Sequence, residues 1–84
     1  MNIRKYEVGK VTILLPGGDL VYEGTKDLDV CLETVADASP YVLLDLVNTK
    51  YLSAKAIGLI AFYVKYFREK HGGLKLIHVN NNLK

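Results

Sequence analysis

The most constraining feature of this sequence is the stretch from Tyr41 to Gly73, which combines a buried strand, a loop and an amphipathic helix. Residues 41–46 are apolar at five of six positions, a pattern typical of a central strand that is covered on both faces. After the loop 47–52, Ser53 is placed to cap a helix. Its apolar stripe is predicted at helical spacing, at Ala56, Leu59, Ile60, Tyr63 and Phe67, widened by Ile57, Phe62 and Val64.

The segments on either side of this stretch predict three further strands and one more helix. Residues 6–8 and 11–15 favour a hairpin around Gly9, because a glycine tolerates the positive φ of a tight turn. Thr25 is a candidate cap for a helix that ends near Asp37, with an apolar stripe at Leu28, Cys31, Leu32 and Val35. Gly72 suits the left-handed position after the second helix, and residues 74–79 are predicted to form the last strand.

This order, β-β-α-β-α-β, predicts the α/β class and one domain over residues 1–84. Two strand–helix–strand crossovers imply parallel pairing with right-handed connections. We therefore expect a four-stranded mixed, mostly parallel sheet with both helices packed on one face. The opposite face must be solvated, capped by bulky residues or covered by a partner.

Composition narrows the classes of function. The net charge of +2 is too small to indicate nucleic-acid binding. The single cysteine, Cys31, excludes an internal disulfide and is expected in the core, and with no leader visible a reducing cytoplasm is expected. No apolar run is long enough for membrane insertion. No spacing of potential ligands or catalytic groups indicates a metal, a cofactor or an enzyme.

The strand VLLDL, the helix start YLSAKAIGLI and the strand KHGGLKLI are similar to those of the STAS domain, whose best-known members are bacterial anti-sigma factor antagonists. The resemblance covers residues 6–79. In such antagonists the helix opens with Asp-Ser-Ser-Gly, and a kinase-like anti-sigma factor phosphorylates the second Ser. Residue by residue, Ser53 stands at the Asp, Ala54 at the first Ser, Lys55 at the phospho-acceptor and Ala56 at the Gly. The resemblance therefore implies a docking surface without the usual phosphorylation switch.

The resemblance also implies a missing element, because the family normally adds a strand or helix after the last strand. Only five residues follow Val79 here. We therefore expect a domain that lacks this final element, with an apolar patch that a second chain could cover.

The candidate partner-binding surface comprises the loop and helix start at 48–58 with the turn at 19–23. Its predicted residues are Asp19, Tyr22, Asn48, Thr49, Ser53, Lys55, Ile57 and Gly58. Lys55 is either a cation for a partner's carboxylate or a solvated side chain. Ser53 is better explained as a cap than as a phosphorylation site, although phosphorylation there stays open.

Other polar residues have simpler interpretations. Thr49 is a further hydroxyl near the helix start, and Asp45 is expected to orient the loop by accepting backbone N–H groups. A phosphohistidine at His71 or His78 lacks the surroundings that phosphate needs.

The sequence thus predicts a non-enzymatic protein–protein interaction module. By resemblance, its partner is an anti-sigma factor or kinase-like ATPase in the regulation of transcription, or a transporter ATPase. The alternatives are a homodimeric or larger scaffold and, less favoured, a phosphoryl carrier.

Overall fold

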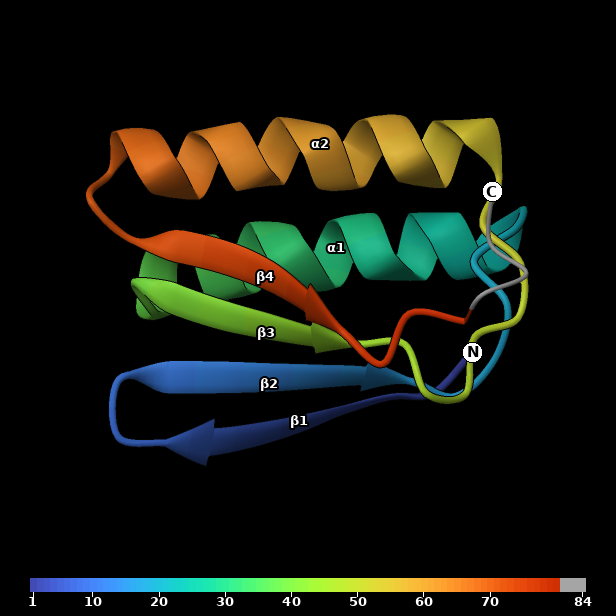
Figure 1. The fold of residues 1–84 in the computed structure, drawn as a ribbon, viewed down its shortest axis with the longest axis horizontal. Coiled ribbons are helices and arrows are strands. Elements are labelled where there is room, and N and C mark those ends of the chain that lie inside the picture. Colours follow the sequence, from blue (N-terminus) through green and yellow to red (C-terminus); the bar gives the residue numbers. More distant parts are fainter. Residues whose placement is uncertain (81–84) are drawn as a thin grey trace.

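The computed structural model describes residues 1–80 and confirms the predicted architecture (Figure 1). The sheet order is β1-β2-β3-β4, with β1 antiparallel to β2 and the remaining neighbours parallel. Both helices lie on the same side of the sheet. The elements are β1 (Ile3–Val8), β2 (Val11–Pro16), α1 (Glu23–Ala38), β3 (Tyr41–Asp45), α2 (Ala54–Glu69) and β4 (Gly73–Ile77).

The core fills the space between the helices and the sheet. Alternate residues of β2 and β3, Leu14, Val42 and Leu44, are at most 1% exposed and face the helices. The helices pack against these residues with buried side chains at helical spacing, as the sequence predicted. Those side chains are Leu28, Leu32, Val35, Ala36, Ala56, Ile60, Tyr63 and Phe67.

The first strand is longer than predicted, since β1 begins at Ile3 rather than at Tyr6. It pairs with β2 over its whole length, and Gly9 occupies the turn with a φ of 60°. The last strand is shorter than predicted and ends at Ile77, because His78 has a φ of 55°, which an extended strand does not allow. The prediction that nothing regular follows Val79 falls largely on residues 81–84, outside the described part.

The predicted start of α1 was wrong. Thr25 lies inside the helix, and the N-cap is Tyr22, whose side chain makes no capping hydrogen bond. The observed N-cap lies three residues before the predicted one. A Cβ added to Gly24 would meet the carbonyl oxygen of Asp19 at 2.5 Å, so the backbone turns tightly here. Only glycine permits that approach.

The predicted start of α2 was right, but the predicted width of its buried stripe was wrong. The Ser53 hydroxyl accepts a hydrogen bond from the backbone N–H of Ala56 at 3.0 Å. Ile57 is 49% exposed and Phe62 is 60% exposed, whereas the sequence predicted both on the buried side. Neither α1 nor the sheet covers the outer side of α2, so only one side of this helix is buried.

The turn after α2 also differs from the prediction. The left-handed residue is His71, with a φ of 64°, and not Gly72. Gly72 is needed for a different reason, because a Cβ there would lie 1.9 Å from the carbonyl oxygen of Pro40. The glycine thus lets the chain pass against the start of β3, and the backbone N–H of Gly73 donates to the same carbonyl at 3.0 Å.

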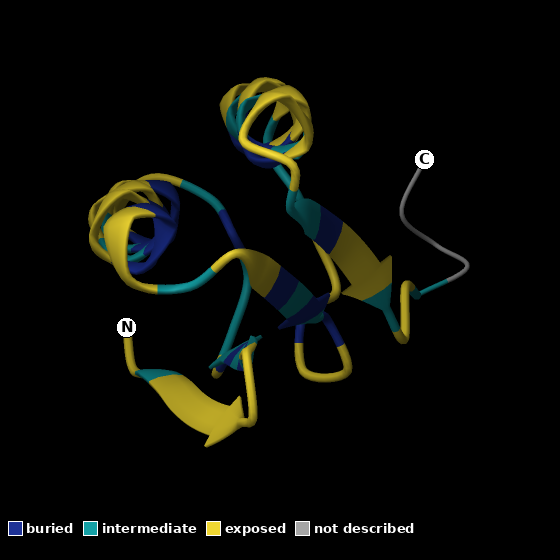
Figure 2. Ribbon diagram, turned by 90° about the vertical axis from the view of Figure 1, so that its left-hand side faces the viewer, coloured by how far each residue is buried: buried dark blue, intermediate teal, exposed yellow. Residues whose placement is uncertain are grey.

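The face of the sheet opposite the helices carries no covering element among residues 1–80 (Figure 2). Its side chains come from the alternate positions of all four strands, and many of them are apolar. Three of them, Tyr6, Val8 and Tyr41, are 45%, 65% and 44% exposed.

Candidate functional site

The best-defined surface site lies where the two helices start, at the carboxyl ends of β2 and β3. We call residues 19–26 and 49–56 the helix-start corner. Leu20 and Leu52 form an isolated parallel bridge between its two segments. The backbone N–H of Leu20 donates to the Tyr51 carbonyl at 3.0 Å, and that of Ser53 donates to the Leu20 carbonyl at 2.9 Å. These bonds join the two loops and hold the two helix starts side by side.

Two side chains on the other side of this bridge fix the loop before α2. One Asp19 carboxylate oxygen accepts from the backbone N–H groups of Lys50 at 2.8 Å and Tyr51 at 3.2 Å. The Thr49 hydroxyl donates to the Gly18 carbonyl at 2.9 Å. Asp19 is half-buried and Thr49 is only 1% exposed. Both were predicted as partner-binding residues, but the structure gives them the role of holding the loop, and Thr49 has no surface to offer.

The two helix starts also contact each other directly. The Ser53 hydroxyl lies 3.2 Å from that of Thr25, in the first turn of α1, while it caps α2. Thr25 is buried and Ser53 is partly buried, so this contact is partly shielded from water. The prediction of Ser53 as a cap is confirmed, and its phosphorylation stays a prediction.

An open cleft of about 520 Å³ lies between the helix starts. The site residues Tyr22, Ser53 and Lys55 all line it, so the structure brings these three predicted residues together. Of the other lining residues, Val21 and Glu23 fall within the predicted turn at 19–23, whereas sequence reasoning missed Thr25 and Lys26. Their position could not be read from sequence, because the start of α1 was predicted too late.

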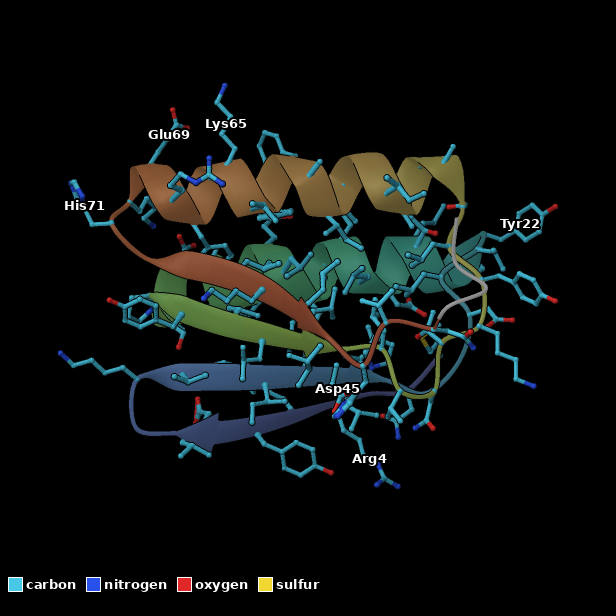
Figure 3. All side chains as sticks on the ribbon, viewed as in Figure 1. Arg4, Tyr22, Asp45, Lys65, Glu69 and His71 are labelled. Atoms are coloured by element: carbon cyan, nitrogen blue, oxygen red, sulfur yellow. The ribbon has the colours of Figure 1, made fainter. Side chains whose placement is uncertain are left out.

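Tyr22 is the most prominent side chain of the cleft. It is 87% exposed, and Figure 3 shows it projecting away from the end of the molecule. Its backbone is held at φ 49° and ψ −119°, a sparsely populated region for a residue with a Cβ. Tyr22 lies between Leu20, which forms the bridge, and Gly24, whose backbone passes close to that of Asp19.

The lining of the cleft carries two lysines, Lys26 and Lys55, and one glutamate, Glu23. Lys55 is exposed in the first turn of α2, which carries no acidic residue. Lys26, from α1, lines the same cleft and lies 3.6 Å from the Glu23 carboxylate in an exposed pair. A second hollow of about 220 Å³ continues between the helices, with Lys26, Lys55 and Asp29 in its lining. The arrangement suits a carboxylate-bearing segment better than a cationic one.

The remaining predicted site residues lie apart from the cleft. Asn48 is exposed and lines a different hollow with Asn2, Arg4, Leu15 and Gly17. Ile57 and Gly58 are exposed further along α2, and no atom lies within 4 Å of a Cβ built on Gly58.

Other polar groups hold the fold together. Asp45 orients its loop as predicted, accepting from the Val47 backbone N–H at 3.0 Å, and the same oxygen lies 2.9 Å from Nδ1 of His78. Burial raises the pKa of the Cys31 thiol, with Lys5 opposing the shift slightly, so less of the reactive thiolate forms at neutral pH. Burial also raises the pKa of Tyr63, and the nearby Asp29 and Glu33 add to the shift.

Within residues 1–80, no group of three or more His, Cys, Asp or Glu side chains could hold a metal ion. No helix in the same range is long and apolar enough to cross a membrane.

No family model and no curated protein matches the sequence, but solved structures match the fold. A proposed anti-sigma factor antagonist from Thermotoga maritima has a TM-score of 0.87 at 18% identity, covering 96% of this chain and 71% of that one. The anti-sigma factor antagonist SpoIIAA, in its unphosphorylated form, has a TM-score of 0.79 at 11% identity, covering 94% of this chain and 74% of that one. A chain named Mglu has a TM-score of 0.78 at 15% identity, covering 93% of this chain but only 20% of its own length. These likenesses show that the chain has a STAS-like fold.

Proposed function

We propose that this STAS-like domain is a non-enzymatic interaction module that binds a regulatory protein through the helix-start corner. One observation carries the proposal: the exposed Tyr22, the capping Ser53 and the exposed Lys55 converge on one cleft at the start of α2. This is the place where the resemblance puts the partner-binding surface of anti-sigma factor antagonists. An exposed aromatic ring beside a cation is a common composition for the centre of a protein interface.

The cleft chemistry supports a partner segment that carries carboxylates. Lys26 and Lys55 reach it from different helices, and Glu23 lies beside Lys26 at the outer edge. The Lys55 charge stands in a helix first turn, where a cation costs a few tenths of a kcal/mol. A partner's Asp or Glu would remove that small penalty while it is bound.

The interaction would not be controlled by the phosphorylation switch that the resemblance would otherwise imply. Lysine at position 55 lacks a hydroxyl to accept a phosphoryl group, and its charge is opposite to that of a phosphate. The Ser53 hydroxyl is engaged with Thr25 and with the N–H of Ala56. Binding would then depend on the amounts of the two proteins rather than on phosphorylation.

The candidate partners are an anti-sigma or kinase-like ATPase and, as the alternative, a transporter ATPase. Titration calorimetry of the purified chain with one partner of each kind from the same organism tests both. We expect Lys55→Glu to weaken binding about tenfold, an effect in the range of one charge pair at an interface. Lys65→Glu is the matched control, because Lys65 is an exposed lysine on the same helix that points away from the cleft.

Equal affinities of the parent and Lys55→Glu for the partner that binds would refute the proposed surface. Incubation with the partner and ATP, followed by mass spectrometry, checks the second part of the proposal. A phosphoryl group on Ser53 would show that a switch operates after all.

A further inference from the structure

The strongest feature that the proposed function does not use is the uncovered face of the sheet. The register gives this face three rows of four side chains, one row at each end and one across the middle. Eight of the twelve positions are apolar and one is a glycine. The central part of the face consists of Val11, Ile13 and Leu15 from β2 and Tyr41 and Leu43 from β3.

The positions of the three charged residues on this face limit what can bind to it. Arg4 is on edge strand β1, Lys75 is on edge strand β4, and Asp45 is on β3 at the same end of the sheet as Arg4. Figure 3 shows Arg4 and Asp45 at that end. Among the described residues, no ion pair joins any two of these three, and Asp45 instead contacts His78 and the Val47 backbone. The face therefore offers both signs of charge to whatever covers it.

We propose that the uncovered sheet face binds a second copy of this chain, sheet against sheet, about a two-fold axis parallel to the strands. Face-to-face sheets pack with nearly aligned strands, about 10 Å apart. Rotation about such an axis lays β1 of one copy over β4 of the other, and β2 over β3. Strand direction is retained, so that each row meets the same row of the partner copy.

The pairs in the first two rows are complementary in size or in chemistry. In the first row Val8 of one copy meets Gly73 of the other, which places a large residue over the smallest. In the middle row Ile13 meets Leu43, and the Tyr6 ring meets Lys75, a favourable pairing of an aromatic face with a cation. In the last row Arg4 meets Ile77 and Leu15 meets Asp45. The long Arg4 side chain extends sideways by one strand to reach Asp45 of the second copy.

The other two-fold axis in the plane of the sheet, perpendicular to the strands, lacks this complementarity. It would place each edge strand over its own copy, so Lys75 would face Lys75 and Tyr6 would face Tyr6. The like charges oppose that arrangement. Arg4 would then face Val8, with no carboxylate beside it.

The size of the face sets the expected strength of the dimer. Four strands spaced about 4.8 Å apart, each five residues long at about 3.3 Å per residue, project an area of roughly 300 Å² per copy. Protruding side chains have more accessible surface than this flat area. Two such faces therefore bury on the order of 1,000 Å² of accessible surface, at the small end of specific interfaces. We therefore expect a dissociation constant in the micromolar range and a monomer at high dilution.

Sedimentation equilibrium of the full chain, over about 1 to 300 µM, tests the proposal. We expect Ile13→Glu, at the centre of the face, to raise the dissociation constant at least tenfold. Val8→Glu should act in the same direction, and it cannot simply unfold the monomer because Val8 is 65% exposed. Phe62→Glu, a substitution of an equally exposed apolar residue on α2, is the control and should leave the dimer unchanged.

Three results would overturn the proposal: a parent chain that stays monomeric at the highest concentration, unchanged association in both sheet variants, or loss of association in the Phe62→Glu control.

Lys75→Ala tests the direction of the two-fold axis. We expect this variant to associate as strongly as the parent or more weakly, whereas tighter association would show that two Lys75 side chains face each other. Far-UV circular dichroism of each variant verifies its fold. Since the face lies opposite the helices, Val8→Glu should leave partner binding at the helix-start corner intact, which separates a failure of this proposal from a failure of the proposed function.

Discussion

The role of Asp19 in holding the helix-start corner leads to a quantitative prediction for Asp19→Ala. One carboxylate oxygen accepts two backbone N–H groups, from Lys50 and Tyr51. Hydrogen bonds to a charged group contribute about 1.5–3 kcal/mol each. Water can reach the loop and replace part of the hydrogen-bond energy lost, because both donor N–H groups belong to exposed residues. We therefore expect Asp19→Ala to lower the free energy of unfolding by about 2 kcal/mol.

The assay is urea unfolding followed by circular dichroism, with a thermal scan in parallel. For a chain of this length a loss of 2 kcal/mol corresponds to a fall in Tm of about 8–16 °C. Asp19→Asn keeps an acceptor oxygen without the charge and should lose only about 1 kcal/mol. Asp29→Ala, at an exposed position of α1, is the matched control and should change stability by less than about 0.5 kcal/mol.

A local measurement distinguishes the proposed cause from a general loss of stability. Hydrogen exchange of the Lys50 and Tyr51 amides should accelerate in Asp19→Ala by more than the global change in stability accounts for. A variant as stable as the Asp29→Ala control, or unchanged exchange at these two amides, would refute the argument that Asp19 holds the loop.

Three further predictions follow from the glycines, the helix cap and the cysteine. Gly72→Ala should destabilise the fold by more than about 2 kcal/mol, because its Cβ would lie 1.9 Å from the Pro40 carbonyl oxygen. Gly58→Ala, in open space within a helix, should instead stabilise the fold by about 0.5–1 kcal/mol. Chemical denaturation compares the two variants, and a Gly72→Ala variant of unchanged stability would contradict the close approach. Ser53→Ala removes the cap of α2 and should cost about 1 kcal/mol, with an unchanged unfolding midpoint as the contrary result. The pKa of the Cys31 thiol is raised in the folded state, so the stability that this thiol contributes is present below its pKa in the unfolded chain and is lost as the pH rises through its pKa in the folded chain. The thermal midpoint should therefore fall above about pH 9, and it should fall less steeply in Cys31→Ala. Equal slopes in the two proteins would contradict this prediction.

The order of elements could be predicted because each element carries a local signal. The β-prone apolar runs of β2 and β3 indicate strands, and helical spacing from Leu28 to Val35 indicates α1. The start of α1 was predicted too late because Thr25 is a common capping residue, whereas the actual N-cap, Tyr22, makes no side-chain capping bond and leaves no cap signal in the sequence.

The candidate site was predictable as a region but not in its details. The cap motif and the resemblance both pointed to the residues around Ser53 and Lys55, and the structure places these at one cleft with Tyr22. Burial cannot be read from a loop sequence, so Thr49 was predicted at the surface although it is 1% exposed. Lys26 was overlooked because the start of α1 was predicted too late.

The bridge between Leu20 and Leu52, with its two flanking backbone bonds, has a consequence for the kinetics and thermodynamics of recognition. These bonds give the two loops their shape before any partner arrives. Little conformational freedom would then remain to be lost on association, apart from that of exposed side chains such as Tyr22. Encounter should resemble the joining of two rigid bodies, with a rate governed by diffusion and orientation and with no slow folding phase.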